Sequence, residues 1–147
     1  MPRLDFDRHV EHRPEQMFAL VADLERYPEF ISNCKSMQVK RDSGTPGDVR
    51  FAKMTLSFGP ITQAYTSRVV FDAKAGTIDA KATDGPFKYL TSQWRFEPEG
   101  TGTHIHFEID FKISNPLLAA VAEPAFAAKQ AEIMDAFGEE ADRRYER

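Results

Sequence analysis

The most constraining feature of this chain is a segment in which apolar and polar residues alternate without exception. Apolar residues stand at every odd position from Ile105 to Ile113, and His, Glu, Asp or Lys stands at every even position between them. Successive side chains of a β-strand point to opposite faces, so this strand has one dry face and one wet face. That pattern is typical of an antiparallel sheet covered on one side. The rest of the chain must supply the cover.

The same reasoning predicts further strands at 3–10, 36–41, 49–58, 62–71, 77–82 and 89–97, separated by short turns at 42–47, 59–60, 75–76, 84–86 and 99–102. Pro14 suits the first turn of a helix that should run to Asp23, and residues 24–30 should form a second short helix or turn. Ser114-Asn115-Pro116 is a helix start, and the Ala-rich segment from there to Arg147 should form a long helix. Pro124 lies inside it, where we expect a kink or a break.

These elements predict an α+β fold in one domain, residues 1–147. About seven antiparallel strands should form a strongly curved sheet wrapped on the long C-terminal helix, with the two short helices after the first strand closing one end. The space between sheet and helix is where a ligand would bind.

Composition narrows the function. Nineteen basic and twenty-three acidic residues give a net charge of −4, which argues against a dedicated nucleic-acid-binding protein. No DNA partner is expected, while contact with RNA or the ribosome through a local patch stays open. The local basic concentration is Lys35, Lys40, Arg41, Arg50 and Lys53. The single cysteine, Cys34, has no partner for a disulfide within the chain, and the charged N-terminus is unlike a signal peptide. We therefore expect a cytoplasmic location.

Three motifs carry a resemblance to a known family. Residues 20–31 contain a helix followed by Tyr27-Pro28-Glu29-Phe30, and residues 84–96 contain Gly85-Pro86-Phe87 followed by Leu90 and Trp94-Arg95-Phe96. The third is Ser114-Asn115-Pro116-Leu117-Leu118. Together they resemble the coenzyme Q-binding START-domain family, within the helix-grip (START/Bet v 1-like) superfamily that also contains polyketide cyclases and a bacterial ribosome-association toxin. The resemblance covers essentially the whole chain.

The resemblance implies a carrier, not an enzyme, that holds ubiquinone (coenzyme Q) or a similar prenyl lipid in its cavity and supports respiration or quinone biosynthesis. No cofactor is required under this hypothesis. Transient contact with the inner face of a membrane is expected near residues 27–31. One alternative is a toxin or translation regulator directed at the ribosome, acting through a surface patch. A weaker alternative is an aromatase/cyclase-type enzyme.

Candidate cavity residues are apolar side chains expected on the inner face of the sheet or on the helices, together with hydroxyl groups that could bind quinone oxygens. They are Phe18, Tyr27, Phe30, Met54, Leu56, Tyr65, Ser67, Leu90, Trp94, Phe96, Phe107, Val121, Phe126, Ile133 and Phe137, with Ser92 as a further hydroxyl. Most of these could equally be ordinary core residues.

No catalytic or metal site is predicted. His104, His106 and Glu108 share one face of a strand and could present metal ligands, but the alternation favours an outer face in water. His9 and His12 flank the end of the first strand and are expected at the surface. Cys34 has no histidine in a suitable position to activate it.

Overall fold

The computed structural model describes residues 3–42, 44, 46–58 and 60–145. The strands are β1 (Arg3–Val10), β2 (Cys34–Arg41), β3 (Asp48–Phe58), β4 (Ile61–Asp72), β5 (Thr77–Ala82), β6 (Phe87–Glu99) and β7 (Gly102–Ile113). The helices are α1 (Pro14–Ala22), the 3-10 turn η1 (Leu24–Arg26), α2 (Tyr27–Phe30) and α3 (Pro116–Arg144). This confirms the predicted order of elements. The predicted turns at 42–47 and 59–60 include residues 43, 45 and 59, and the predicted helix end at Arg147 also lies outside the described residues.

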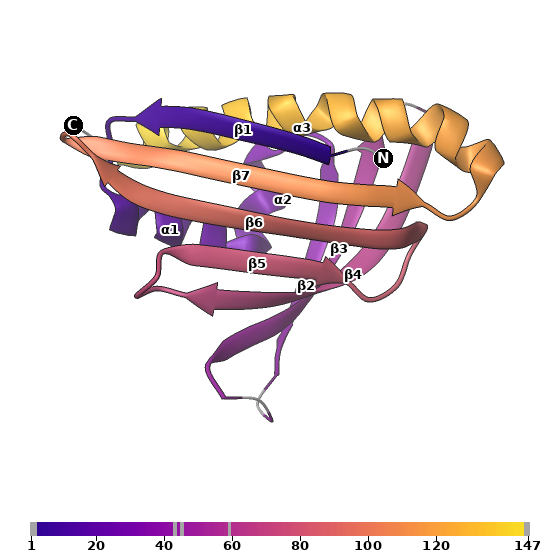
Figure 1. The fold of residues 1–147 in the computed structure, drawn as a ribbon, viewed down its shortest axis with the longest axis horizontal. Coiled ribbons are helices and arrows are strands. Elements are labelled where there is room, and N and C mark those ends of the chain that lie inside the picture. The colour runs from indigo at the N-terminus through magenta and orange to yellow at the C-terminus, as the bar shows by residue number, and fades with distance from the viewer. Residues whose placement is uncertain (1–2, 43, 45, 59, 146–147) are drawn as a thin grey trace.

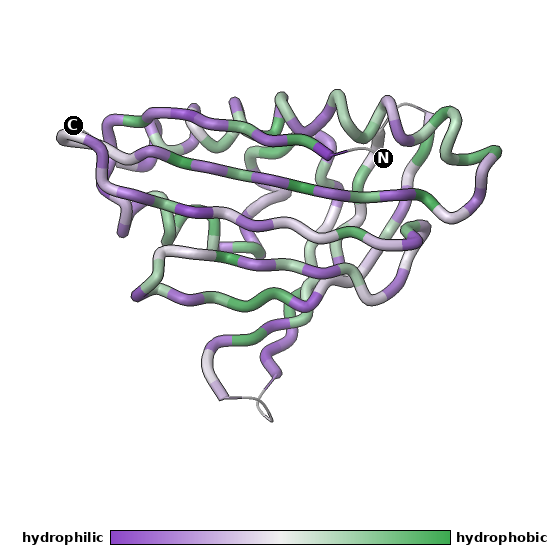
Figure 2. Tube along the Cα trace, viewed as in Figure 1, coloured by the Kyte–Doolittle hydropathy of each residue, from purple (hydrophilic) through white to green (hydrophobic). Residues whose placement is uncertain are grey.

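The strands form one antiparallel sheet in the order β1-β7-β6-β5-β4-β3-β2. Strands β2 to β7 are neighbours in chain order, and β1 joins the free edge of β7 (Figure 1). In this register Phe107 pairs with Phe6 on β1 and with Trp94 on β6. The odd-numbered residues of β7 therefore share the inner face with large side chains of both neighbours. Figure 2 shows the alternation of hydrophobic and hydrophilic residues along β7.

The helix α3 runs along the sheet and covers its inner face (Figure 1). The Asn115 side chain caps its start by accepting hydrogen bonds from the backbone N–H groups of Leu117 and Leu118, at 2.9 and 3.2 Å. The helix buries a stripe of side chains at helical spacing: Ala122, Phe126, Gln130, Met134, Phe137 and Ala141. None of the helices in the described residues is long and apolar enough to cross a bilayer.

Of the kink or break expected at Pro124, the break is wrong, because α3 continues through this residue as one helix of 29 residues. The kink stays a prediction. Pro124 is on the exposed side of the helix. Its neighbour Glu123 accepts a hydrogen bond from the backbone N–H of Ile113 at 2.8 Å, which ties the helix to the end of β7. The packing of the buried stripe and the hydrogen bond of Glu123 outweigh the free-energy cost of a proline inside the helix.

Candidate functional site: a cavity between the sheet and the C-terminal helix

A cavity lies between the inner face of the sheet and α3, with η1 and α2 at one end. Its empty space, including the part open to solvent, is about 830 Å³. The wall is formed by Leu24, Tyr27, Ile31, Met37, Ala52, Met54, Leu56, Tyr65, Ser67, Val69, Ile78, Ala80, Leu90, Ser92, Trp94, Phe107, Ile109, Gln130, Ile133 and Phe137. Strands β2 to β7 and three helical segments contribute to it.

The cavity exists because small side chains occupy the middle of the inner face. Ala52 on β3 pairs with Ser67 on β4, and Ala80 on β5 pairs with Ser92 on β6. All four line the cavity. Protein interiors are otherwise close-packed, so large residues at these positions would fill the space between sheet and helix. The sequence thus leaves room at the centre while Phe and Trp fill the ends.

Four neutral polar residues of the wall, Tyr65, Ser67, Ser92 and Gln130, face this apolar space. Burial raises the pKa of the Tyr65 hydroxyl, so it stays protonated and can donate a hydrogen bond. Among the described residues this hydroxyl has no hydrogen-bond partner. The Gln130 amide donates to the backbone oxygen of Phe126 at 3.2 Å, a bond that leaves the amide oxygen as an acceptor.

Tyr27 differs from Tyr65 although both line the cavity. The Tyr27 hydroxyl donates a hydrogen bond to the backbone oxygen of Val21, and burial raises its pKa too. The ring packs edge-on against Phe137 of α3, with the ring centres 5.2 Å apart. Tyr27 therefore fixes η1 and α2 against α3, and Tyr65 is the tyrosine available to a ligand.

The aromatic end of the wall is built around Trp94, the single tryptophan of the chain. Its ring lies 4.4 Å from that of Phe107 and 5.1 Å from that of Phe137, measured between ring centres. These three residues come from β6, β7 and α3, so this cluster joins the sheet to its covering helix. A molecule in the cavity would contact the indole ring directly.

Most of the candidate cavity residues lie on the wall. They are Tyr27, Met54, Leu56, Tyr65, Ser67, Leu90, Trp94, Phe107, Ile133 and Phe137, with the further hydroxyl of Ser92. The structure brings them together around one space. That they bind a ligand stays a prediction.

Five candidates lie elsewhere, and their placement on the wall is corrected. Phe18 and Phe96 pack against each other with ring centres 6.0 Å apart, and Phe30 packs on Phe137 at 5.4 Å. Phe126 is fully buried against Phe87 and Phe111, where it plugs one end of the core. Val121 is 52% exposed on the far side of α3. The sequence placed Val121 on the buried side of α3 because the helix is Ala-rich and has apolar residues on several sides, so its buried face does not stand out in the sequence.

Sequence reasoning missed Gln130, the polar group that α3 contributes. Its spacing from Phe126 and Phe137, four and seven residues, places it on the buried stripe and could have indicated it. It also missed the small residues Ala52 and Ala80, since space is not visible in a hydrophobic pattern.

The other candidate residues lie outside the cavity. The rings of His104 and His106 both donate hydrogen bonds to Oδ1 of Asp7, at 2.7 and 2.9 Å, on the outer face as expected. Asp5, His106 and Glu108 bring ligand atoms within 4.8 Å of one another, but the Arg3 guanidinium already lies 2.9 Å from Glu108 Oε2 and offsets their charge. The surface position expected for His12 is wrong.

His12 is 3% exposed, and its Nε2 lies 2.8 Å from Asp142 Oδ1. This contact links the residues after β1 to the last turns of α3.

Burial raises the pKa of the Cys34 thiol to about 11, so the thiol is protonated at neutral pH and is a poor nucleophile.

Residues 10–138 match the protein family described as polyketide cyclase / dehydrase and lipid transport. The chain belongs to this family. Over 130 residues it is 31% identical to the ribosome association toxin RatA of Pseudomonas aeruginosa, covering 88% of each chain. It is 24% identical to the mitochondrial coenzyme Q-binding protein coq10 of Schizosaccharomyces pombe, covering 91% of this chain and 83% of the other.

The fold matches that of solved structures. The Zhui aromatase/cyclase from Streptomyces sp. R1128 superimposes with a TM-score of 0.86 at 14% identity, over 97% of this chain and 94% of the other. This likeness establishes the fold, which is the helix-grip arrangement expected from the sequence. The proteins similar to this chain in sequence thus include a ribosome association toxin and a coenzyme Q-binding protein, and an aromatase/cyclase shares its fold.

Proposed function

We propose that this protein binds a neutral hydrophobic lipid in its cavity, and that ubiquinone is the ligand it fits best. The observation that carries the proposal is the composition of the wall. Apolar side chains surround a few neutral hydrogen-bonding groups, and no charged side chain lines the cavity within the described residues. A quinone has matching chemistry, because its ring and isoprene units are apolar and its carbonyl and methoxy oxygens accept hydrogen bonds.

The Tyr65 hydroxyl is the donor that we assign to a quinone oxygen. It is protonated, buried and free of a partner among the described residues. Ser67 on the same strand and Ser92 on β6 provide further hydroxyls on the same wall. The likeness to coq10 supports this ligand class over other neutral lipids.

Binding without turnover is the mode that the wall supports. General acid–base catalysis needs a group whose pKa lies near the working pH. The titratable groups of the wall are Tyr27 and Tyr65, and burial moves the pKa of each upward, away from neutrality. We therefore propose a carrier that acts in the cytoplasm and at the inner face of a membrane, not a cyclase.

Trp94 makes the proposal directly testable. A ubiquinone with a two-isoprene tail, titrated into the protein, should quench the fluorescence of Trp94 and saturate at one molecule per chain. Tyr65→Phe should weaken binding about fivefold to tenfold, the value of one hydrogen bond, without lowering the unfolding temperature. The matched control, Tyr27→Phe, removes the bond to Val21 and should lower the unfolding temperature more than it changes affinity.

A second variant protects the test from an ambiguous result. Ser92→Leu should fill the space and abolish quenching while the protein stays folded, as judged by circular dichroism. Wild-type protein that neither quenches nor retains the quinone through gel filtration would contradict the proposal.

Ribosome association is the second candidate, and the 31% identity to RatA is the observation that favours it. It needs a surface and not an occupied cavity. Expression in a bacterial host followed by sucrose-gradient sedimentation distinguishes the two functions. Co-sedimentation with a ribosomal subunit that persists in Ser92→Leu would support this candidate independently of the lipid.

A further inference from the structure

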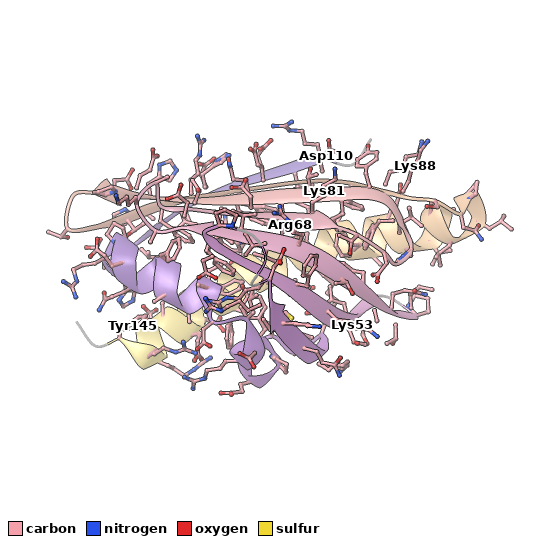
Figure 3. All side chains as sticks on the ribbon, turned by 90° about the horizontal axis from the view of Figure 1, so that it is seen from below. Lys53, Arg68, Lys81, Lys88, Asp110 and Tyr145 are labelled. Carbon is pink, nitrogen blue, oxygen red and sulfur yellow. The ribbon has the colours of Figure 1, made fainter. Side chains whose placement is uncertain are left out.

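The outer face of the sheet carries a row of basic side chains around one aromatic ring. Register places Lys40 of β2 beside Phe51 of β3, Phe51 beside Arg68 of β4, and Arg68 beside Lys81 of β5. Lys53 follows Phe51 by two residues on the same face. Neighbouring strands are about 4.8 Å apart, so the row from Lys40 to Lys81 extends about 14 Å. Figure 3 shows Lys53, Arg68 and Lys81 on this side of the sheet.

The charges of this row are not balanced by the fold. Arg68 and Lys81 stand directly opposite each other, an arrangement of like charges that destabilises a sheet. Within residues 3–42, 44, 46–58 and 60–145, none of the four basic side chains forms an ion pair. Among the same described residues, three acidic groups lie near the row without an ion pair to it. Asp84 accepts from the backbone N–H of Thr66 at 2.6 Å, Asp79 accepts from the Gln93 amide at 2.8 Å, and Asp110 lies two strands beyond Lys81.

The sequence had indicated a different basic cluster. Arg41 and Arg50 belong to it by position, but both lie near the Asp48 carboxylate, at 4.0 and 3.0 Å. The Arg50 guanidinium also packs over the ring of Phe71, 4.6 Å from its centre. These two charges are therefore used within the protein. Strand pairing instead brings Arg68 and Lys81 into one row with Lys40 and Lys53. Which charges lie together is decided by the register of the strands and not by distance along the sequence.

Phe51 is the second independent feature of this surface. It is partly exposed and is neither a core residue nor one of the partly buried side chains that pack against the core. The ring lies on the wet face of its strand and does not pack against the core. Lys40 and Arg68 flank it on the adjoining strands, and Lys53 flanks it along its own strand.

We propose that this outer face of β2 to β5 binds a single-stranded or looped segment of RNA, with Lys40, Lys53, Arg68 and Lys81 on phosphates and Phe51 stacked on a base. Proteins that bind single strands combine basic side chains along the backbone path with aromatic platforms for the bases. A membrane would also attract the charges, but a bilayer offers no stacking partner to a ring flanked by three cations. The inference does not rest on what the cavity binds, because the sheet separates the two faces.

Fluorescence anisotropy with a fluorescein-labelled dodecamer of uridine tests the proposal on the full chain. Four phosphate contacts predict a slope of log affinity against log salt of about −2.8, or an affinity loss of about 50-fold between 50 and 200 mM NaCl. Arg68→Gln with Lys81→Gln should reduce the slope to about −1.4, with a loss of about sevenfold over the same range. Phe51→Leu should weaken binding roughly tenfold and leave the slope unchanged.

The controls separate binding from folding and from total charge. Lys74→Gln with Lys88→Gln also removes two positive charges, but at positions outside the row. This variant should leave the affinity for RNA within about twofold of wild type. The Arg68/Lys81 variant should be at least as stable as wild type, since it removes a repulsive pair, and it should bind quinone unchanged. Absence of RNA binding in wild type at 50 mM salt, or equal losses in both double variants, would overturn the proposal. Binding of phosphatidylserine vesicles without binding of RNA would reassign the surface to a membrane.

Discussion

At the scale of single residues, Gly85 is a position that only glycine fits. Its φ is +98°, and a Cβ there would lie 2.5 Å from the Cβ of Tyr65. Gly85→Ala should lower the free energy of unfolding by about 3 kcal/mol or more, because backbone strain and a steric clash combine. Gly47→Ala is the matched control, since φ is +87° but no atom lies within 4 Å of the added carbon. It should cost about 1 kcal/mol. Equal losses for both variants in urea unfolding would show that the clash is relieved.

A second residue, His9, gives a pH dependence. Hydrogen bonds to Glu11 and then to Glu99 raise the pKa of His9 above its usual 6.5. Its contribution to stability is therefore complete below pH 6.5, while both glutamates are ionised, and is lost as the pH rises through the folded-state value. Between pH 6 and pH 9, the unfolding temperature of wild type should fall further than that of the His9→Gln variant. Parallel curves for the two proteins would exclude this role.

The candidate site could be predicted from sequence where strands form it and less well where helices do. Alternation assigns Met54, Tyr65 and Trp94 to the inner face, because a strand has two sides and one is plainly apolar. The Ala-rich helix offers no such contrast, so Val121 was placed inside and Gln130 was overlooked. Which inward residues line an empty space and which are packed depends on their neighbours across strands, and a single sequence does not contain that register.

At the scale of elements, α3 should be more stable without its proline. Pro124 removes one backbone hydrogen bond from an otherwise continuous helix, and proline costs about 3 kcal/mol relative to alanine in a helix interior. Because it is exposed, Pro124→Ala should raise the free energy of unfolding by about 1–3 kcal/mol. If the proline also lets α3 bend to admit ligand, the variant should release quinone more slowly in stopped-flow measurements of Trp94 fluorescence. Unchanged rates would leave Pro124 without a role in exchange.

The start of α3 is also where we expect membrane contact, instead of residues 27–31. Tyr27 and Ile31 are buried, whereas Leu117 is 84% and Val121 52% exposed. The first turns of α3 project beyond the sheet (Figure 1), and Lys112 precedes them on β7. Leu117→Ser with Val121→Ser should slow quinone transfer from vesicles severalfold and leave binding of a short-tailed quinone in solution unchanged. Transfer at the wild-type rate would place the contact elsewhere.

At the scale of the whole molecule, the sheet separates two chemistries. The inner face encloses a cavity with a neutral wall, and the outer face of β2 to β5 is basic. The outer face of β1 and β7 carries the paired His and carboxylate side chains. A protein built this way can present a surface to one partner and a pocket to another without coupling the two. The proposed lipid and RNA sites therefore lie on opposite faces of one sheet, so a variant of one face should leave the other function unchanged.

The size of the cavity sets how much of a quinone the protein can enclose. A tail of roughly fifty carbons, at about 30 Å³ each, would need ~1,500 Å³, well above the 830 Å³ that the cavity offers with its mouth. The ring and the first isoprene units should therefore be enclosed, and the remaining tail should protrude into a membrane. Each buried methylene contributes about 0.8 kcal/mol, so affinity should rise steeply over the first two or three isoprene units and then level off. Titration of Trp94 fluorescence with quinones of one, two, three and six isoprene units measures this directly. A continued rise in affinity at six units would mean that the tail follows a groove along the protein, and an affinity that falls beyond one unit would mean that the cavity is closed at its mouth.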